Sequence, residues 1–182
     1  MQATSVFATI ANNGVRVSPT VIAGTQDPSG HFTPAANRTT TRVVSEATAR
    51  ELSLMMESVV SPTGTAPSAA IPGYRVAGKT GTAWRYNDKT GGYSGYTASF
   101  IGFAPADAPR YVINVTIQDP RNGYYGGLLC GPVFKKVMTF VLQTKHVAPT
   151  GTKVLPVALN QKDLTRMKAT QVSAEKSGAT RQ

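Results

Sequence analysis

Cysteine, histidine, tryptophan and acidic residues are scarce in this 182-residue chain, which has one Cys, two His, one Trp and nine Asp plus Glu. The single cysteine, Cys130, excludes an intrachain disulfide. Its apolar neighbours favour a small buried side chain over a nucleophile, because a Cys nucleophile needs a histidine nearby and only His31 and His146 exist. We predict no metal site and no cofactor.

Long hydrophobic runs are also missing. No stretch of about 18 apolar residues occurs, so we expect no membrane span in this chain. The amino terminus lacks a basic segment followed by an apolar one, so no signal peptide is predicted. Two readings stay open: a cytoplasmic chain, or an export signal on sequence outside these residues.

Acidic residues are too few to balance the basic ones, and the formal net charge is +10. Such a charge suggests nucleic-acid or anionic-surface binding. The positive residues are spread out, however: residues 1–145 carry 13 Lys plus Arg against 7 Asp plus Glu, and residues 146–182 carry 6 against 2. We therefore predict no nucleic-acid binding, and weak affinity for anionic polymers or lipid head groups is the more plausible role.

Three helices are expected from apolar periodicity and end signals. The first ends at Asn12-Asn13-Gly14, since Gly14 suits the left-handed position after a helix. The second begins after Ser45 as N-cap and ends near Ser61-Pro62. The third is expected to start at Pro132, a residue favoured in a first turn, and to end near residue 145. Residues 15–44 read as irregular or extended.

Three strands are expected at 74–83, 97–104 and 110–118. The last alternates apolar and polar residues with a period of two. The turn residues 106–109 predict an antiparallel hairpin between the second and third strands. The fold class is therefore α+β, with an antiparallel sheet and packed helices. Residues 1–145 form the predicted domain, and residues 146–182 read as a basic, disordered tail.

The segment Gly78-Lys79-Thr80-Gly81-Thr82 contains the Lys-Thr-Gly triplet found in penicillin-binding proteins and class A β-lactamases. Lys79 can supply a cation for a substrate carboxylate, and the Thr80 and Thr82 hydroxyls can hydrogen-bond that carboxylate. The backbone N–H of Thr82, on an edge strand, can act as an oxyanion-hole donor, and Gly81 keeps the edge free of a side chain. The alternative is an exposed edge-strand lysine that only opposes aggregation.

A wider resemblance favours the first reading. The order of landmarks from residue 2 to 142 resembles class B penicillin-binding proteins of the FtsI type, the division D,D-transpeptidases, with an actinobacterial flavour. The matching segments are Gln2-Ala3-Thr4 to Gly14-Val15, Val59-Val60 with Gly64-Thr65-Ala66, Tyr74 to Ala83, Ser99 to Pro105, and Tyr124-Tyr125-Gly126-Gly127 with Pro132-Val133-Phe134.

The resemblance implies a partial penicillin-binding/β-lactamase-like transpeptidase fold. It also implies that Lys79 and Thr82 act in catalysis and that Lys79, Thr80, Gly81 and Thr82 bind the substrate. The implied partners are a peptidoglycan stem peptide, β-lactam antibiotics and, for an intact parent, division-complex proteins. The implied location of that parent is the extracytoplasmic face of the bacterial cytoplasmic membrane.

The family's nucleophile is missing from these 182 residues. The family uses Ser-x-x-Lys, then Ser-x-Asn, then Lys-Thr-Gly. No Ser-x-Asn occurs here, and the one Ser-x-x-Lys, from Ser173 to Lys176, follows Lys-Thr-Gly and lacks an apolar helix around it. We interpret it as a chance match and expect the chain alone to be inactive, because little catalysis remains without the nucleophile.

Three hypotheses follow. The chain is the carboxy-terminal part of an FtsI-type transpeptidase, whose upstream DNA would encode both missing motifs and a membrane anchor; or a non-catalytic module that binds a peptide or β-lactam; or a β-lactamase-superfamily fragment, which the absence of a placed deacylating Glu disfavours. An edge strand at 110–118 would be prone to aggregation, so we expect a marginally stable or partly molten chain.

Overall fold

The computed structural model describes residues 1–35 and 38–151 of the chain. These residues form three α-helices, one short 3-10 helix and seven β-strands. The order is α1 (Gln2–Ala11), β1 (Val15–Val17), β2 (Gly24–Gln26), β3 (Phe32–Pro34), β4 (Thr40–Arg42), α2 (Glu46–Ser58), a short 3-10 helix (Pro67–Ala69), β5 (Ala77–Asn87), β6 (Gly92–Ala104), β7 (Tyr111–Gln118) and α3 (Gly126–Thr144).

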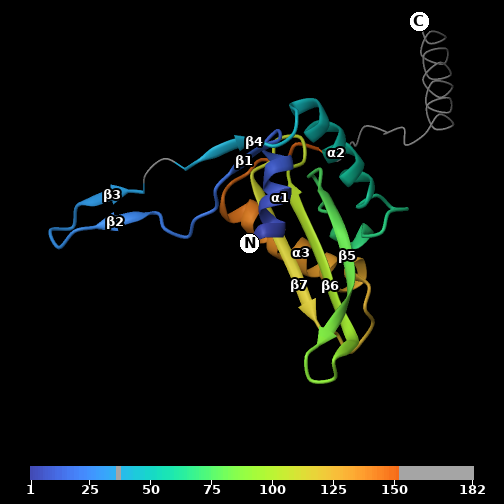
Figure 1. Ribbon diagram of the computed structural model, residues 1–182. Helices are drawn as coiled ribbons and strands as arrows, with labels where there is room; N and C mark the ends of the chain where they lie inside the picture. The colour runs from blue at the N-terminus through green and yellow to red at the C-terminus, as the bar shows by residue number, and fades with distance from the viewer. Residues whose placement is uncertain (36–37, 152–182) are drawn as a thin grey trace, which may run out of the picture.

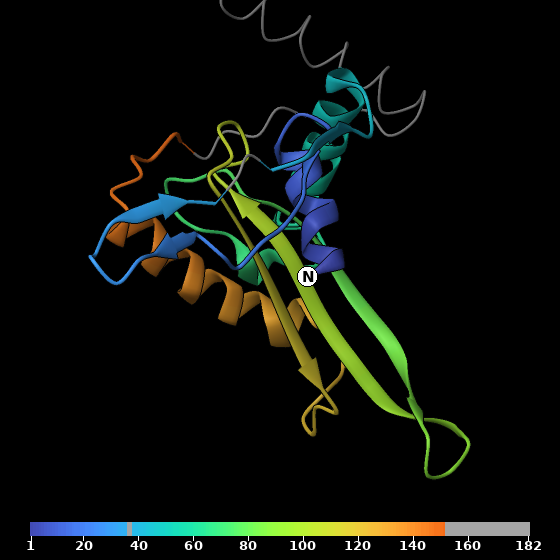
Figure 2. The same cartoon turned by 60° about the vertical axis from the view of Figure 1, so that its left-hand side comes forward.

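The body has three layers, with an antiparallel sheet between helices (Figure 1, Figure 2). Strands β5, β6 and β7 form the central sheet in that order. Helix α3 packs along one face of the sheet, and α1 and α2 lie on the other side, α1 over β6 and β7 and α2 beside β5. The α+β class and the antiparallel sheet with packed helices are confirmed.

Strand β7 follows the alternation that its sequence predicts. Tyr111, Ile113, Val115 and Ile117 pack against the buried cluster that includes α3. Its even-numbered residues face the other way: Val112 joins the cluster beneath α1, and Asn114 donates a hydrogen bond to Thr4 of α1 at 3.3 Å. The hairpin between β6 and β7 is confirmed, with Thr97 paired to Gln118 at one end and Ala104 to Tyr111 at the other.

Helix α3 begins six residues before the predicted start, and Pro132 lies inside it. The prediction of a start at Pro132 was therefore wrong. A proline removes one helical hydrogen bond and crowds the preceding turn, but the glycines before and beside it allow an unusually close approach. A Cβ on Gly126, Gly127 or Gly131 would collide with Ser99, Thr65 or Ser68 respectively. This packing against the rest of the body stabilises the extra turns of the helix.

The other two helices agree with the sequence. Helix α1 ends at Ala11, and Gly14 has φ +82°, the left-handed conformation that a glycine adopts without strain. Helix α2 has Ser45 as its N-cap, whose hydroxyl accepts a hydrogen bond from the Thr48 N–H at 3.1 Å. The helix ends at Ser58, three residues before Ser61.

Residues 15–44, expected to be irregular or extended, form two small antiparallel pairs. Strand β1 pairs with β4, and β2 pairs with β3. Together they make an arm that projects from the body (Figure 1). Arg42 ties the base of the arm to the helices, because its guanidinium donates to the carbonyl oxygens of Asn13 and Val44, both at 3.1 Å.

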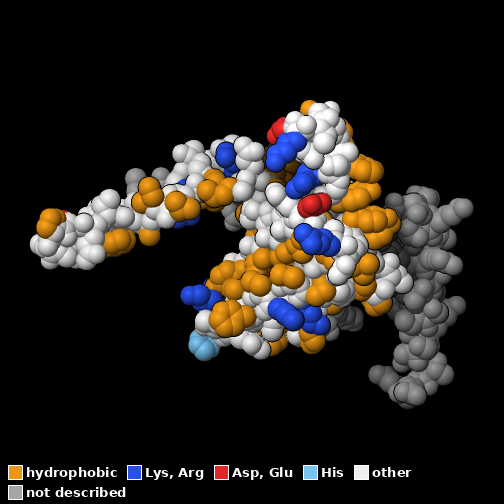
Figure 3. Space-filling model, turned by 90° about the horizontal axis from the view of Figure 1, so that it is seen from below, with side chains coloured by type: hydrophobic (Ala, Val, Ile, Leu, Met, Phe, Trp, Pro, Cys, Tyr) orange, Lys and Arg blue, Asp and Glu red, His pale blue; other side chains and the backbone are white. Residues whose placement is uncertain are grey.

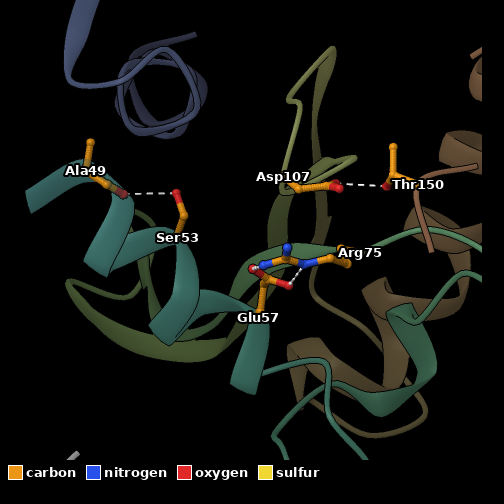
Figure 4. Close-up of polar contacts among 6 residues, drawn as sticks. All are labelled: Ala49, Ser53, Glu57, Arg75, Asp107 and Thr150. Carbon is orange, nitrogen blue, oxygen red and sulfur yellow. Dashed lines mark hydrogen bonds and ion pairs between the residues drawn. The ribbon is translucent and has the colours of Figure 1, made fainter. Parts of the chain in front are cut away.

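The start of the predicted tail contacts the body. Tyr74 donates a hydrogen bond to the Val147 carbonyl at 2.6 Å. Thr150 donates one to Asp107 at 2.8 Å, as Figure 4 shows. Val147 also packs against the main buried cluster. The rest of the predicted tail, residues 152–182, lies outside the described residues, so its disorder stays a prediction. Across residues 1–35 and 38–151, no helix is long and apolar enough to cross a membrane.

Candidate active site

The Lys-Thr-Gly triplet lies near the start of β5, which is an outer strand of the described sheet. Lys79, Thr80, Gly81 and Thr82 pair with residues 101, 100, 99 and 98 of β6. In an antiparallel pair, backbone groups of successive residues point alternately toward the neighbouring strand and away from it. The Thr80 carbonyl accepts a hydrogen bond from the Lys79 ammonium at 2.9 Å, which indicates that it points away from β6.

The same alternation applies to Thr82, two residues further along. Its backbone N–H and carbonyl then also point toward the free edge of β5. This is the orientation that an oxyanion-hole donor requires. The Lys79 ammonium lies over the same edge, since it also donates to the Thr80 hydroxyl at 3.4 Å. A cation, a hydroxyl and an outward backbone donor, from Lys79, Thr80 and Thr82, therefore lie within four positions of one strand.

The side chains of Thr80 and Thr82 are held on the α3 face of the sheet. The Thr80 hydroxyl lies 3.3 Å from the hydroxyl of Thr65, in the loop before the 3-10 helix. The Thr82 hydroxyl donates to the Tyr124 carbonyl at 3.5 Å and accepts from the Gly126 N–H at 3.4 Å. These contacts orient both hydroxyls beside the edge while leaving Thr82 and Lys79 exposed to solvent.

The first turn of α3 adds positive potential to this edge. The early N–H groups of a helix lack helical partners and carry a partial positive charge. One of them, the Gly126 N–H, points at the Thr82 hydroxyl. Sequence reasoning missed this feature because it placed the helix start at Pro132. The Gly126-Gly127 pair was the sequence signal for this start, because a Cβ on Gly126 would collide with the sheet and one on Gly127 with the loop at Thr65.

Gly81 and Gly78 lie against side chains of the neighbouring strand β6. A Cβ there would lie 2.5 Å from the Ser99 hydroxyl, and a Cβ on Gly78 would collide with the ring of Phe100. Both glycines let β5 lie flat against β6. The role of Gly81 in keeping the edge between Thr80 and Thr82 free for a ligand stays a prediction.

A buried ion pair anchors the segment that leads into β5, four residues before Lys79. The Glu57 carboxylate at the end of α2 has no exposed surface, and Arg75 donates to both of its oxygens, at 2.8 Å from Nε and 2.6 Å from Nη2 (Figure 4). This hydrogen bonding raises the pKa of Arg75 above its ordinary value. The Arg75 carbonyl in turn accepts from the Ala106 N–H at 2.8 Å. Helix α2, β5 and the β6–β7 turn are thus joined at one point.

The described residues contain no cluster of three His, Cys, Asp or Glu side chains that could hold a metal ion. The Ser173 to Lys176 segment, interpreted as a chance match, lies outside the described residues. The site therefore consists of one wall: a lysine, two threonine hydroxyls, an outward strand edge and a helix N-terminus.

The penicillin-binding protein transpeptidase domain family matches residues 1–139. The chain belongs to this family. Among relatives, it is 40% identical over 157 residues to the penicillin-binding protein PbpB of Mycolicibacterium smegmatis, a match that covers 81% of this chain and 24% of the relative. It is 44% identical over 109 residues to the peptidoglycan D,D-transpeptidase FtsI of Escherichia coli, covering 59% of this chain and 18% of that protein.

Solved transpeptidase structures have the same fold. The crystal structure of penicillin-binding protein 3 of Mycobacterium tuberculosis complexed with ampicillin superposes with a TM-score of 0.77 at 35% identity, covering 87% of this chain and 37% of that one. The similarity to class B, FtsI-type transpeptidases is confirmed, and the mycobacterial relatives fit an actinobacterial origin. The chain spans about a quarter or less of the length of these curated relatives, so it is a partial transpeptidase domain.

Proposed function

We propose that this chain forms the substrate-carboxylate and oxyanion-binding wall of a peptidoglycan D,D-transpeptidase site. In this proposal the Lys79 ammonium and the Thr80 and Thr82 hydroxyls bind the ligand's terminal carboxylate. The Thr82 N–H stabilises the negative oxygen of the tetrahedral intermediate. Gly81 admits the ligand backbone between them.

One observation carries the proposal: the Lys79, Thr80 and Thr82 groups converge on the free edge of one strand. The ammonium reaches the Thr80 carbonyl and hydroxyl at 2.9 and 3.4 Å. Binding an extended peptide along such an edge supplies backbone hydrogen bonds, while side chains supply selectivity. The alternative role of Lys79, as a solvated lysine that opposes aggregation, does not account for the threonine hydroxyls held at 3.3 to 3.5 Å from Thr65, Tyr124 and Gly126.

The complete reaction needs a nucleophile that these 182 residues do not supply. A serine Oγ would attack the penultimate carbonyl carbon of the stem peptide, form an ester and release the terminal amino acid as an amine. An acceptor amine would then attack the ester, form the cross-link and release the serine. The chain contributes charge stabilisation and positioning to both steps, and we expect no acylation of the chain alone.

The ligands in this proposal are the peptidoglycan stem peptide and β-lactams, and a parent protein would also contact division proteins. The ampicillin complex of the mycobacterial structure and the names of the relatives support the first two. Because the polymer lies outside the cytoplasmic membrane, the proposed location is the extracytoplasmic face of that membrane.

Ligand binding measured on the 182-residue chain tests whether Lys79, Thr80 and Thr82 bind the terminal carboxylate. We expect a peptide ending in D-Ala-D-Ala to shift amide resonances of β5 in a two-dimensional NMR titration, with millimolar affinity because one wall supplies few contacts. Lys79→Ala should abolish the shifts. Lys89→Ala is the matched control, since Lys89 is an exposed lysine in the turn after the same strand. Equal shifts in wild type and Lys79→Ala would refute the assignment.

A non-catalytic binding module remains the second candidate, favoured by the missing Ser-x-x-Lys and Ser-x-Asn. The two candidates differ in covalent chemistry. The gene product expressed in its own cells should carry a covalent label from a fluorescent penicillin if it is a transpeptidase, and should bind penicillin only reversibly if it is a module. Mass spectrometry of the purified 182-residue chain should find no adduct in either case, and an adduct would contradict the missing nucleophile.

A further inference from the structure

A cavity of about 460 Å³ lies between the end of α2, the segment from the 3-10 helix to β5, and α3. We call it the α2–α3 cavity. Its walls are mostly apolar and are formed by Val60, Pro62, Ile71, Pro72 and Val76. Cavities of roughly 300 to 1,000 Å³ with apolar walls and a few polar groups commonly bind small molecules. The residues of the candidate active site are not part of this lining, so the cavity is a separate feature.

The walls of the α2–α3 cavity are fixed before any ligand arrives. The chain makes a tight turn before β5, in which the Tyr74 N–H donates to the Ile71 carbonyl at 3.1 Å. Pro72 in the second position and Gly73 at φ +82° in the third match a type II turn. The Tyr74 hydroxyl donates to the Val147 carbonyl at 2.6 Å, which holds this side chain in the lining. Such a preformed cavity loses little conformational entropy on binding.

Three charged side chains line the cavity, and two of them neutralise each other. Arg75 donates to both oxygens of the Glu57 carboxylate, at 2.8 and 2.6 Å. The third, Lys135 of α3, is half-buried, yet it belongs to none of the ion pairs formed within residues 1–35 and 38–151. A half-buried ammonium loses part of its hydration, and a bound anion replaces the lost interaction. The cavity therefore combines apolar walls with one unmatched positive charge.

Helix geometry places only one of two adjacent lysines at the cavity. Lys136 follows Lys135 directly, but it is exposed and is not part of the lining. Successive residues of an α-helix point about 100° apart, so the two side chains leave α3 in different directions. The positive charge at the cavity is thus a property of position 135, and Lys136 offers a matched control.

We propose that the α2–α3 cavity binds a small amphiphilic carboxylate, that is, a compact apolar body with one negative charge. The apolar body packs among Val60, Ile71 and Val76, and the carboxylate accepts a hydrogen bond from the Lys135 ammonium. Charge complementarity selects this class of ligand, because the remaining charges of the lining form a closed pair. The site goes beyond the proposed peptide site and does not rest on it.

Three probes separate the apolar part of the ligand from its charge: 2-naphthoate, the neutral 2-naphthylmethanol, and acetate. We expect 2-naphthoate to shift the amide resonances of Ile71, Tyr74 and Val76 in two-dimensional NMR spectra of the 182-residue chain. In calorimetry it should bind about tenfold more tightly than 2-naphthylmethanol, the effect of one hydrogen bond to a charged group. Acetate should not bind at the same concentrations. Unshifted amides, equal affinities of the two naphthyl probes, or acetate binding as tightly as 2-naphthoate would each overturn the proposal.

Substitutions locate the charge and the cavity. Lys135→Gln should reduce the affinity ratio of the two naphthyl probes to about one, while Lys136→Gln should leave it at about ten. Ala70→Trp, at an exposed position of the lining, should fill the cavity and weaken both naphthyl probes. Equal effects of Lys135→Gln and Lys136→Gln, or unchanged binding in Ala70→Trp, would overturn the assignment of the ligand to this cavity.

A carboxylate probe could also bind at the proposed peptide site, and Lys79→Ala distinguishes the two. The substitution should leave the affinity of 2-naphthoate unchanged, because Lys79 is not part of the cavity lining. Loss of 2-naphthoate binding in Lys79→Ala would overturn the cavity site and place the probe at the peptide site. Lys135-dependent binding in a chain that shows no Lys79-dependent peptide binding would support the cavity and contradict only the peptide site.

Discussion

The two faces of the central sheet are packed very differently. Within the described residues, twelve buried residues form one cluster on the α3 side, including Phe100 and Phe134, whose rings meet edge to face at 4.8 Å. The α1–α2 side has a separate buried cluster of four residues, among them Met56 and Phe103. A groove of about 380 Å³ lies beside it, lined by α1, α2 and the base of the arm.

The difference matches the placement of the candidate site, which lies toward the α3 side. The threonine hydroxyls of the candidate site are fixed from the α3 side, through Thr65, Tyr124 and Gly126. A site that stabilises a transition state must be rigid before the ligand arrives, and close packing supplies that rigidity. The α1–α2 side carries no contact to these hydroxyls and exposes apolar residues such as Val6 and Val43.

Apolar exposure is not confined to that side. Helix α3 also exposes Val133, Val137 and Phe140 on its outer surface, while Phe134 and Met138 are fully buried beneath it. Figure 3 shows hydrophobic side chains gathered over the body, with Lys and Arg side chains among them and few acidic ones. The two faces of the sheet therefore differ in the size of the buried cluster that packs against each. Substitutions in the two clusters can measure how much each contributes to stability.

Replacing a buried methionine by alanine on each face of the sheet gives the largest expected change in the free energy of unfolding. Met138 has no exposed surface in the α3 cluster and Met56 is 9% exposed in the smaller one. Met138→Ala should lower the free energy of unfolding by about 4 kcal/mol and Met56→Ala by about 2 kcal/mol, because a cavity costs most where the surroundings cannot relax. Urea unfolding followed by circular dichroism measures both values.

The chain is expected to be only marginally stable, so Met138→Ala could be unfolded without denaturant. The same two positions changed to Val remove less volume and should preserve the order of the effects. Equal losses at the two positions would show that the faces are equally well packed and would contradict the comparison. A cooperative wild-type transition with a high urea midpoint would contradict the expected marginal stability.

The Glu57–Arg75 pair joins the α1–α2 side to the strand that carries Lys79. Glu57→Gln should lower the free energy of unfolding by about 3 kcal/mol, because it leaves Arg75, only 16% exposed at its side chain, without its charge partner. Since Arg75 lies four residues before Lys79, amide resonances of β5 should shift as well. Urea unfolding and NMR spectra of the variant measure both effects.

A paired replacement is the control for that prediction. Glu57→Leu combined with Arg75→Met removes both charges and should recover most of the lost stability, because well-packed apolar residues can replace a buried ion pair. If the double variant were no more stable than Glu57→Gln, the loss would come from packing rather than from an unpaired charge.

Local signals in the sequence predicted most of the fold. The alternation of β7 predicted which of its residues share one face, and the structure shows that this face meets α3. Ser45 predicted the start of α2. These features depend on residues close in sequence. The start of α3 depends on contacts of Gly126 and Gly127 with residues 99 and 65, which no local pattern reveals, so the proline was given too much weight.

The candidate site was predictable to the same degree. The Lys-Thr-Gly triplet identified Lys79, Thr80 and Thr82 because they lie within four positions of one strand. The contacts around them join residues 12 to 28 positions apart: the Glu57–Arg75 pair, and the packing of Tyr96 against Trp84 and Tyr124. Only the folded chain brings those residues together.

The N-cap of α2 gives a smaller expected effect. Ser45→Ala removes the acceptor for the Thr48 N–H and should lower the free energy of unfolding by about 1 kcal/mol. Ser45→Asp keeps an acceptor and adds a negative charge at the helix N-terminus, so it should be neutral or slightly stabilising. Equal losses for Ala and Asp in urea unfolding would show that the cap bond contributes nothing.

The smallest effect is expected on the outer surface of α2, at the Glu46–Arg50 pair. This pair has the same chemistry as Glu57–Arg75 and a distance of 3.1 Å, but its side chains are 56% and 71% exposed. Water solvates both charges whether or not they meet, so Glu46→Gln should lower the free energy of unfolding by at most about 0.5 kcal/mol.

Part of even that loss would come from the favourable position of a carboxylate in the first helical turn. Arg50→Gln leaves Glu46 in place, so its effect on the free energy of unfolding measures the ion pair without that contribution. Raising the salt concentration should reduce the effect of Glu46→Gln further, while it leaves the effect of Glu57→Gln nearly unchanged, because salt screens exposed charges and not buried ones. Equal effects of Glu46→Gln and Glu57→Gln on unfolding would mean that burial does not set the strength of these ion pairs.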